Sequence, residues 1–258
     1  FVQPSWKTGE IRIPANSRDA GARSLDARLQ LAVAPAATGE TLSVVGEETS
    51  LQVGDTLVES TLKVENHHLW ELDAPFLYRV TARLCLSGEQ ARGDIHEQSV
   101  RCGFRDFRLE DGYFRLNGKR IYLKCSHTGN CCPIGLEMPH DPDFLRRDLI
   151  NQKMMRFNTI RFIAGVPKRY QLDLADEIGL MVYPEAYAAW CLGDSPQMKQ
   201  RYNESVFGMI KRDRNHPCIT IWGLLNETND GPVLRHAVSV LPEVRELDDS
   251  RLILLNSG

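Results

Sequence analysis

The residues best suited to chemistry in this sequence are Asn226 and Glu227, which directly follow an apolar run. Residues 218–225 are apolar apart from Thr220, and the run is long enough for one fully buried strand. Parallel α/β folds place their chemistry at the carboxyl ends of such strands, so Glu227 is a candidate catalytic carboxylate. The alternative interpretation is a strand-end glutamate that forms an ion pair with an arginine.

The composition limits the size and class of the protein. Its 258 residues, of which 42% are hydrophobic, suffice for a substantial core and for about two domains. The net charge of −3 provides no basic surface for nucleic acid or an anionic membrane, and no apolar run approaches the roughly 20 residues of a membrane span. The seven cysteines lack metal-type spacing, and their odd number favours reduced thiols and a cytoplasmic protein. We expect no cofactor.

The first hundred residues show the period-two alternation of β-strands. The alternating runs lie at residues 10–13, 24–33, 41–45, 56–64 and 77–86. Short runs of this kind, separated by Gly, Pro, Asn and Asp, predict an antiparallel sandwich over residues 1–103. No catalytic cluster is recognisable in this part, and we interpret the adjacent His67 and His68 as a solvated pair.

From residue 104 onward, strands alternate with helices. Asn117-Gly118 between two short runs predicts a β-hairpin, whose second half is expected to lead into a strand at 121–125. Helices are then expected at 141–156, 168–178, 195–212 and 230–247, and strands at 158–162, 180–183, 219–225 and 252–255. Asp141 is suited to the N-cap of the first helix, and Gly179 to the end of the second. Repeated strand-helix alternation predicts a parallel sheet with right-handed crossovers.

The predicted parallel sheet ends with its last strand. Five strands of a closed barrel would leave two long apolar edges unpaired. An open doubly wound sheet could stop there, but the glycine-rich dinucleotide fingerprint is absent after the first strand. We therefore expect this chain to be part of a longer protein, without either of its ends.

Several segments, in the same order along the chain, resemble glycoside hydrolase family 2, which contains β-galactosidases, β-glucuronidases and β-mannosidases. These segments are Ala74–Tyr78, Gly103–Arg105, Phe114–Lys119, Asn158–Arg161 and Asp176–Val182. The most specific is the string Arg-Asp-x-Asn-His-Pro at 212–217, followed by Trp222 and the Asn-Glu pair. The resemblance implies an all-β immunoglobulin-like sandwich (1–103), followed by about the first five strands of a catalytic (β/α)8 TIM barrel (104–258).

The resemblance also implies catalytic roles. In that family the glutamate of the Asn-Glu pair is the acid/base, here Glu227, and the asparagine, here Asn226, holds the 2-hydroxyl of the sugar. The nucleophilic glutamate comes from a later strand and lies outside this sequence. A retaining glycosidase needs both carboxyl groups, about 5–5.5 Å apart. The acid/base first gives a proton to the departing oxygen and then, ionised, activates water.

Four further residues are candidates for binding the substrate. Arg161 ends the second barrel strand, and in the family this arginine lies near the nucleophile; a structural ion pair is the alternative. Glu185 ends the third strand and matches an acidic position that lines the pocket, with pairing to Arg161 as the alternative. Trp190 is an aromatic residue that could stack on a sugar face, with simple packing as the alternative. His127 could take over a substrate contact.

The chain departs from the family pattern at two sites that face the sugar in relatives. Residues 125–127 are Cys-Ser-His where Gly-x-Asn is usual, and Ala164 stands where a histidine is common. These differences bear on the choice of sugar and on any metal of the galactosidase type, and we assign no metal ligand. They leave the acid/base position intact.

The expected function is therefore hydrolysis of terminal β-glycosidic bonds by a retaining double-displacement mechanism, of the β-galactosidase or β-glucuronidase type. The expected partner is a carbohydrate substrate, and the resemblance allows a homo-oligomer. One alternative is a non-catalytic carbohydrate-binding or assembly protein on the same fold. The other is an inverting enzyme that uses Glu185 with Glu227, which requires carboxyl groups about 6.5–9.5 Å apart.

Overall fold

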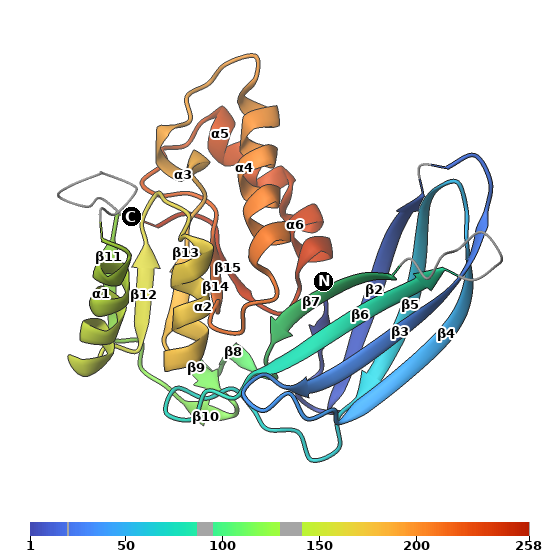
Figure 1. Cartoon of the computed structure of the whole chain (residues 1–258). Helices are drawn as coiled ribbons and strands as arrows, with labels where there is room; N and C mark the ends of the chain where they lie inside the picture. Colours follow the sequence, from blue (N-terminus) through green and yellow to red (C-terminus); the bar gives the residue numbers. More distant parts are fainter. Residues whose placement is uncertain (20, 87–94, 130–140, 258) are drawn as a thin grey trace. The chain divides into compact units, whose positions relative to one another are not determined.

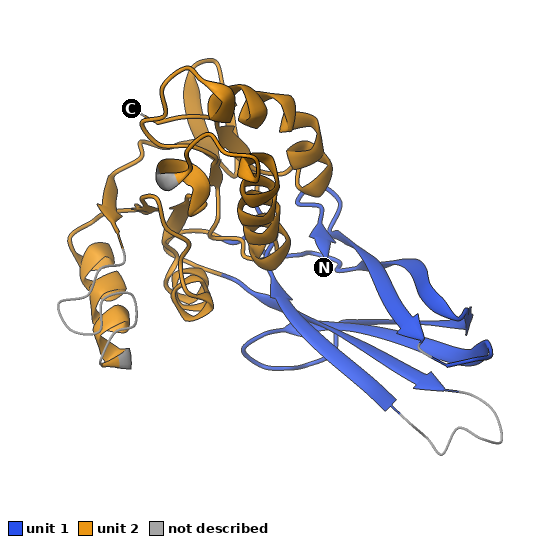
Figure 2. Cartoon of the chain, turned by 90° about the horizontal axis from the view of Figure 1, so that it is seen from above, with its two compact units in different colours: residues 1–70, 76–105 blue, residues 71–75, 106–258 orange. Residues whose placement is uncertain are grey.

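The computed structural model describes residues 1–19, 21–86, 95–129 and 141–257 (Figure 1). Contacts divide the chain into two compact units. The first unit consists of residues 1–70 and 76–105, and the second of residues 71–75 and 106–258 (Figure 2). The short segment Glu71–Pro75 thus belongs with the second unit, although it interrupts the first in sequence. Among the described helices, none is long and apolar enough to cross a membrane.

The first unit is an antiparallel β-sandwich. One sheet has the order β1-β2-β5, with β1 (Gln3–Pro4), β2 (Glu10–Asp19) and β5 (Gly54–Lys63). The other has the order β4-β3-β6-β7, with β4 (Ser43–Leu51), β3 (Leu25–Pro35), β6 (Tyr78–Leu86) and β7 (Ile95–Cys102). This arrangement confirms the predicted sandwich.

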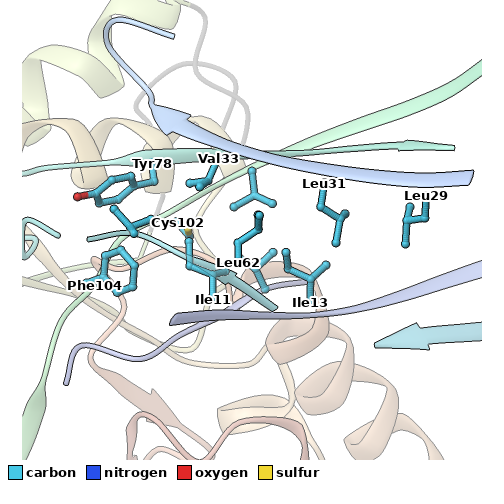
Figure 3. Close-up of a cluster of buried hydrophobic side chains, with 12 residues drawn as sticks. Ile11, Ile13, Leu29, Leu31, Val33, Leu62, Tyr78, Cys102 and Phe104 are labelled. Carbon is cyan, nitrogen blue, oxygen red and sulfur yellow. The ribbon is translucent and has the colours of Figure 1, made fainter. Parts of the chain in front are cut away.

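The core of the sandwich follows from the alternation of its strands. On β2, Ile11 and Ile13 are buried while Glu10 and Arg12 are exposed, as expected for a strand with one face toward a core. Figure 3 shows side chains of the two sheets meeting, with Ile11, Ile13 and Leu62 opposite others that include Leu29, Leu31 and Val33. Each fully buried aliphatic side chain of this kind contributes about 1.5–3 kcal/mol of transfer free energy.

The second unit begins with an antiparallel hairpin sheet of order β10-β9-β8. Its strands are β8 (Phe107–Glu110), β9 (Tyr113–Leu116) and β10 (Lys119–Arg120). The turn between β9 and β10 places Asn117 at φ 50° and Gly118 at φ 79°. Two central residues at positive φ are what a tight hairpin turn requires, which confirms the interpretation of the Asn-Gly pair.

Within the described residues, five strands of the second unit run parallel and alternate with helices (Figure 1). The strands β11 (Cys125–Thr128), β12 (Thr159–Phe162) and β13 (Met181–Pro184) form one sheet, and β14 (Ile221–Gly223) pairs with β15 (Leu252–Leu254). Parallel bridges from Val182 to Ile219 and from Glu185 to Gly223 join β13 to the β14 segment. The open series of parallel strands confirms the predicted partial barrel.

The helices of the second unit are α1 (Pro142–Met154), α2 (Arg169–Ile178), α3 (Ala188–Cys191), α4 (Met198–Asp213), α5 (Pro232–Ser239) and α6 (Leu241–Leu247). Asp141 caps α1 as predicted, because its Oδ1 accepts a hydrogen bond from the Asp143 N–H at 2.9 Å. Gly179 follows α2 at φ 71°. A Cβ at this glycine would overlap the carbonyl oxygen of Leu72, so both the backbone conformation and the close approach require glycine.

The segment Glu71–Pro75 is held against α1 and α2. Lys153 Nζ donates hydrogen bonds to the carbonyl oxygen of Leu72 at 2.6 Å and to that of Gly179 at 2.8 Å. Burial lowers the pKa of Lys153 from its usual value, and the nearby Asp73 opposes this shift. One lysine therefore fastens this segment to the end of α2.

Three expectations about local structure were wrong. The strand expected at 121–125 begins only at Cys125, because the residues before it are bonded by the Asn158 side chain, which accepts from the Lys124 N–H and donates to the Tyr122 carbonyl. The helix expected at 230–247 breaks at Val240, two residues before Pro242, which cannot continue an i to i−4 ladder. The helix expected from residue 195 begins at Met198.

The described cysteines Cys85, Cys102, Cys125 and Cys218 are free thiols. The adjacent pair Cys131-Cys132 lies outside the described residues.

Candidate active site

The segment that contains β14 is buried along its whole length. Every residue from Pro217 to Asn226 is buried. Its backbone is bonded on both sides, since the Val182 N–H donates to the carbonyl of Cys218 and the Leu224 N–H donates to that of Leu254. A strand with partners on both sides and no exposed face explains the continuous apolar run of the sequence.

Gly223 allows the close packing of β14 against β13. A Cβ at this position would overlap the ring of Tyr183 and would lie 2.5 Å from Glu185 Cγ. No side chain fits there, so glycine is required by sterics. The contact also fixes the position of Glu185 next to the end of β14.

Asn226 and Glu227 lie at the carboxyl end of β14. Asn226 is 2% exposed, and its N–H donates to the carbonyl of Ala189 at 2.8 Å. Glu227 is exposed, and its N–H donates to the carbonyl of Ser257 at 2.7 Å. Its φ of 48° lies in the left-handed region, which costs a non-glycine residue about 1–3 kcal/mol and is typical of functional sites. Within the described part of the chain, no hydrogen bond or ion pair holds the Glu227 carboxylate.

The buried centre of the site is an ion pair between Arg161 and Glu185. Arg161 Nη2 lies 2.6 Å and Nε lies 2.8 Å from Glu185 Oε1. The Glu185 side chain is completely buried, whereas that of Arg161 is 21% exposed. The second oxygen of Glu185 accepts a hydrogen bond from the Ala164 N–H at 2.7 Å. The structure thus brings these two predicted residues together in the pairing that the sequence left open, and a substrate contact by Glu185 stays a prediction.

Arg161 also bonds the strand that carries the candidate acid/base. Its Nη2 donates to Asn226 Oδ1 at 2.5 Å and to Ser257 Oγ at 2.6 Å. The Asn226 Nδ2 group is buried and has no hydrogen-bond partner among the described residues. A buried amide N–H2 without an acceptor is unusual, and an unmet donor of this kind is available to a ligand.

Tyr183 lies on the same side of the sheet as Arg161, with which it pairs in register. The Arg161 guanidinium carbon lies 5.3 Å from the centre of its ring. Burial, followed by the charge of Glu185, raises the pKa of Tyr183 well above its usual value. The phenol therefore stays neutral beside the ion pair.

The other two predicted substrate-binding residues, His127 and Trp190, are exposed. His127 on β11 pairs in register with Arg161, so both side chains lie on the same face of the sheet. Trp190 is 60% exposed on α3 and follows Ala189, whose carbonyl oxygen accepts the bond from the Asn226 N–H. Among the described residues, no hydrogen bond joins either side chain to the Arg161 network. Their roles stay predictions.

Ser257 is a member of the network that the sequence analysis missed. Its hydroxyl contacts Arg161, Asn226 and Glu185. The signal was present, because Asn256 and Ser257 are polar residues directly after an expected strand. The reasoning that selected the residues after β14 applies equally to those after β15.

The motif before β14 has a structural role. His216 Nδ1 lies 2.6 Å from Asp176 Oδ2, and the Cys218 N–H donates to Asp176 Oδ1 at 2.9 Å. The side-chain ligand atoms of these three residues lie within 4.8 Å of one another, a grouping that could hold a metal ion. Both carboxylate oxygens of Asp176 already accept hydrogen bonds, so we assign the cluster to anchoring the start of β14 on α2.

A second anchor lies behind β14. Trp222 Nε1 donates to Asp248 Oδ2 at 2.7 Å, and Arg251 Nη1 donates to the same oxygen at 2.9 Å. Burial alone would raise the pKa of Asp248, but the Arg251 guanidinium and the hydrogen bonds from Ser250 and Trp222 outweigh it and hold this pKa below its usual value. The carboxylate therefore stays charged and ties β14 to the segment before β15.

Comparison with protein families gives two matches that together cover nearly the whole chain. The model described as "Glycosyl hydrolases family 2" matches residues 1–105, and that described as "Glycosyl hydrolases family 2, TIM barrel domain" matches residues 107–258. Among curated proteins, a β-galactosidase of Vibrio cholerae serotype O1 is 33% identical over 184 residues, covering 67% of this chain and 17% of the relative. A β-galactosidase of Pectobacterium atrosepticum is 30% identical over 234 residues, covering 87% of this chain and 22% of the relative.

Solved structures of similar fold extend the comparison. A β-glucuronidase of Parabacteroides merdae has a TM-score of 0.78 at 26% identity, covering 98% of this chain and 33% of that one. A glycosyl hydrolase family 2 member from Bacteroides cellulosilyticus has a TM-score of 0.84 at 23% identity, covering 100% of this chain and 34% of that one, and shows the fold alone. The chain thus spans about a fifth of the length of the curated relatives and a third of that of the solved chains.

Proposed function

Because the chain belongs to glycosyl hydrolases family 2, we propose that the protein containing it hydrolyses terminal β-glycosidic bonds, with Glu227 as the acid/base. The observation that carries this proposal is the exposure of the Glu227 carboxylate and its lack of an ion pair with a described residue. It is exposed at the carboxyl end of β14, and no ion pair with another described residue occupies it. Arg161, which bonds the adjacent Asn226, forms its ion pair with Glu185.

The reaction we propose is a retaining double displacement. Glu227 gives its proton to the departing glycosidic oxygen while a second carboxylate attacks the anomeric carbon and forms a glycosyl-enzyme intermediate. Glu227, now ionised, then takes a proton from water, which attacks the same carbon and releases the sugar. An exposed carboxylate can exchange protons with substrate and water, as both steps demand.

We assign the nucleophile to a glutamate outside this sequence. Glu185 is unsuited to attack, because its side chain is completely buried and its oxygens accept bonds from Arg161 and the Ala164 N–H. The same bonds argue against an inverting enzyme in which Glu185 would activate water, since both of its oxygens already accept hydrogen bonds from Arg161 and the Ala164 N–H. Glu185 instead balances the charge of Arg161.

Asn226 is the proposed contact for the sugar's 2-hydroxyl. Its Nδ2 group, which has no partner among the described residues, can donate to a hydroxyl oxygen without changing the charge near Glu227. Hydrogen bonds to the 2-hydroxyl strengthen in the oxocarbenium-like transition state. Of the exposed predicted residues, Trp190 is assigned to stacking on a sugar face and His127 to a polar sugar contact.

We propose a β-galactoside or a β-glucuronide as the substrate. The similar curated proteins bear the name β-galactosidase, and the similar solved structures include β-glucuronidases. A panel of nitrophenyl β-glycosides, given to the complete protein, would separate galactoside from glucuronide hydrolysis.

The test of the acid/base role is Glu227→Gln in the complete protein. For glycosides with poor leaving groups, we expect kcat/KM to fall by about 10²–10⁴-fold, the usual contribution of a general acid. For dinitrophenyl glycosides, whose leaving group needs no proton, the loss in the first step should be much smaller. NMR of the first product would show retention of the anomeric configuration.

Asp230→Asn is the matched control, because Asp230 is an exposed carboxylate three residues farther along the chain that pairs with Arg235. It should leave both rates unchanged. An equal loss of kcat/KM in Glu227→Gln on both classes of glycoside would refute the acid/base assignment. A first product of inverted anomeric configuration would refute the double displacement.

A further inference from the structure

Ser257 flanks the Asn-Glu pair through its backbone. It forms an isolated parallel bridge with Asn226, beyond the ends of β14 and β15. Its N–H donates to the carbonyl of Leu225 at 3.2 Å, and its carbonyl accepts from the N–H of Glu227 at 2.7 Å. These two bonds hold the backbone on both sides of Asn226, including Glu227 in its left-handed conformation.

The hydroxyl of Ser257 makes a second set of contacts with the same neighbours. It accepts from Arg161 Nη2 at 2.6 Å. Its single hydrogen faces two acceptors, Asn226 Oδ1 at 3.1 Å and Glu185 Oε1 at 3.3 Å. A hydroxyl is the smallest group that accepts from a guanidinium and donates to an amide oxygen at the same place.

The orientation of the Asn226 amide follows from these partners. A guanidinium can only donate, so the atom of Asn226 that lies 2.5 Å from Arg161 Nη2 must be the oxygen. Ser257 Oγ reaches the same oxygen. The amide nitrogen is consequently turned away from both, and it has no acceptor among the described residues although it is buried.

We propose that Ser257 is a positioning residue, which keeps the Asn226 amide turned so that its N–H2 group donates to a hydroxyl oxygen of the sugar. The inference rests on the proposed glycosidase function and deepens it, because it assigns a direction to one substrate hydrogen bond. Without the hydroxyl, Arg161 Nη2 loses an acceptor and Asn226 Oδ1 loses one of its two donors. The amide oxygen then keeps only its hydrogen bond from Arg161, so the amide is held less firmly with its N–H2 group toward the sugar hydroxyl.

The experiment compares Ser257→Ala, Ser257→Cys and Ser257→Thr in the complete protein, on a nitrophenyl glycoside and on its 2-deoxy counterpart. Ser257→Ala should lower kcat/KM for the 2-hydroxy substrate by about tenfold, the equivalent of one hydrogen bond, and should affect the 2-deoxy substrate much less. Ser257→Cys keeps the side-chain size but has a weak donor, and it should show the same selective loss if the alanine variant fails to fold. Ser257→Thr keeps the hydroxyl, so its ratio of kcat/KM between the 2-hydroxy and 2-deoxy substrates should match that of the wild type.

Ser239→Ala is the control, because this hydroxyl bonds the His236 carbonyl of its own helix. It should leave both substrates unaffected. Equal losses on the two substrates by Ser257→Ala or Ser257→Cys would overturn the positioning role, as would a selective loss in Ser257→Thr. A wild-type protein inactive on every glycoside would instead overturn the proposed function, so the two failures are distinguishable.

Discussion

Replacing Arg161 by methionine should destabilise the protein more than replacing its partner Glu185 by glutamine. The Glu185 side chain is completely buried, so Arg161→Met leaves a carboxylate away from water without its cation. Removing one member of a buried ion pair costs about 3–5 kcal/mol for this reason. Glu185→Gln leaves a guanidinium that is 21% exposed and still bonds Asn226 and Ser257, so the loss should be about 1.5–3 kcal/mol.

The decisive variant combines both substitutions. In Arg161→Met with Glu185→Gln, no charge is buried, and the glutamine oxygen can still accept from the Ala164 N–H. We expect the double variant to be more stable than Arg161→Met alone by at least about 1 kcal/mol. The free energies of unfolding would be measured by urea denaturation of the complete protein at pH 7, following tryptophan fluorescence. Simple addition of the two losses would refute the reasoning, because it would mean that Glu185 is not left as an uncompensated charge.

Three further substitutions test the support of the site. Gly223→Ala should cost about 1–3 kcal/mol, because a Cβ would overlap the side chains of Tyr183 and Glu185. Trp222→Phe should cost a similar amount, about 1–3 kcal/mol, because it removes the N–H that bonds the buried carboxylate of Asp248. His216→Gln should destabilise more at pH 6 than at pH 8.5. Burial opposes protonation of this histidine, but its bond to Asp176 prevails and raises its pKa, so its contribution is complete below its unfolded pKa and is lost as the pH rises through the folded value.

Each of these has a measurement that can contradict it. For Gly223 the control is Gly208→Ala on α4, where the added carbon would meet no described atom within 4 Å beyond its chain neighbours and its own helix backbone, and alanine favours the helix. Thermal midpoints that fall equally for both glycines would argue against a steric cause. An unfolding free energy unchanged in Trp222→Phe would mean that Asp248 finds another donor. Losses from His216→Gln that are the same at both pH values would exclude the proposed linkage.

Local sequence patterns predicted much of the fold because they depend on neighbours along the chain. The turn at Asn117-Gly118, the cap at Asp141 and the stop at Gly179 each follow from the conformational preference of one or two residues. The alternation of apolar residues predicted the strands of the sandwich, because burial on one face repeats with the strand period.

The features that were missed depend on distant residues. The stretch before Cys125 is bonded by Asn158, more than thirty positions away, so no local pattern could show that it is not a strand. The Asn226-Glu227 pair was predicted because it directly follows an apolar run. Ser257 also follows an expected strand, but its contact with Arg161, 96 positions away, is not visible in any local pattern.

The segment Glu71–Pro75 has a consequence for any attempt to cut the protein into separate pieces. Residues up to Trp70 and from Phe76 to Arg105 belong to the first unit, whereas the intervening segment and the residues after Arg105 belong to the second. A fragment ending near residue 105 would carry the Leu72 carbonyl without the Lys153 ammonium that binds it. The complementary fragment would expose the tight bend at Gly179. Because a cut near residue 105 separates residues 71–75 from the unit to which they belong, neither fragment would contain a complete unit. Experiments on either unit therefore need both in one chain.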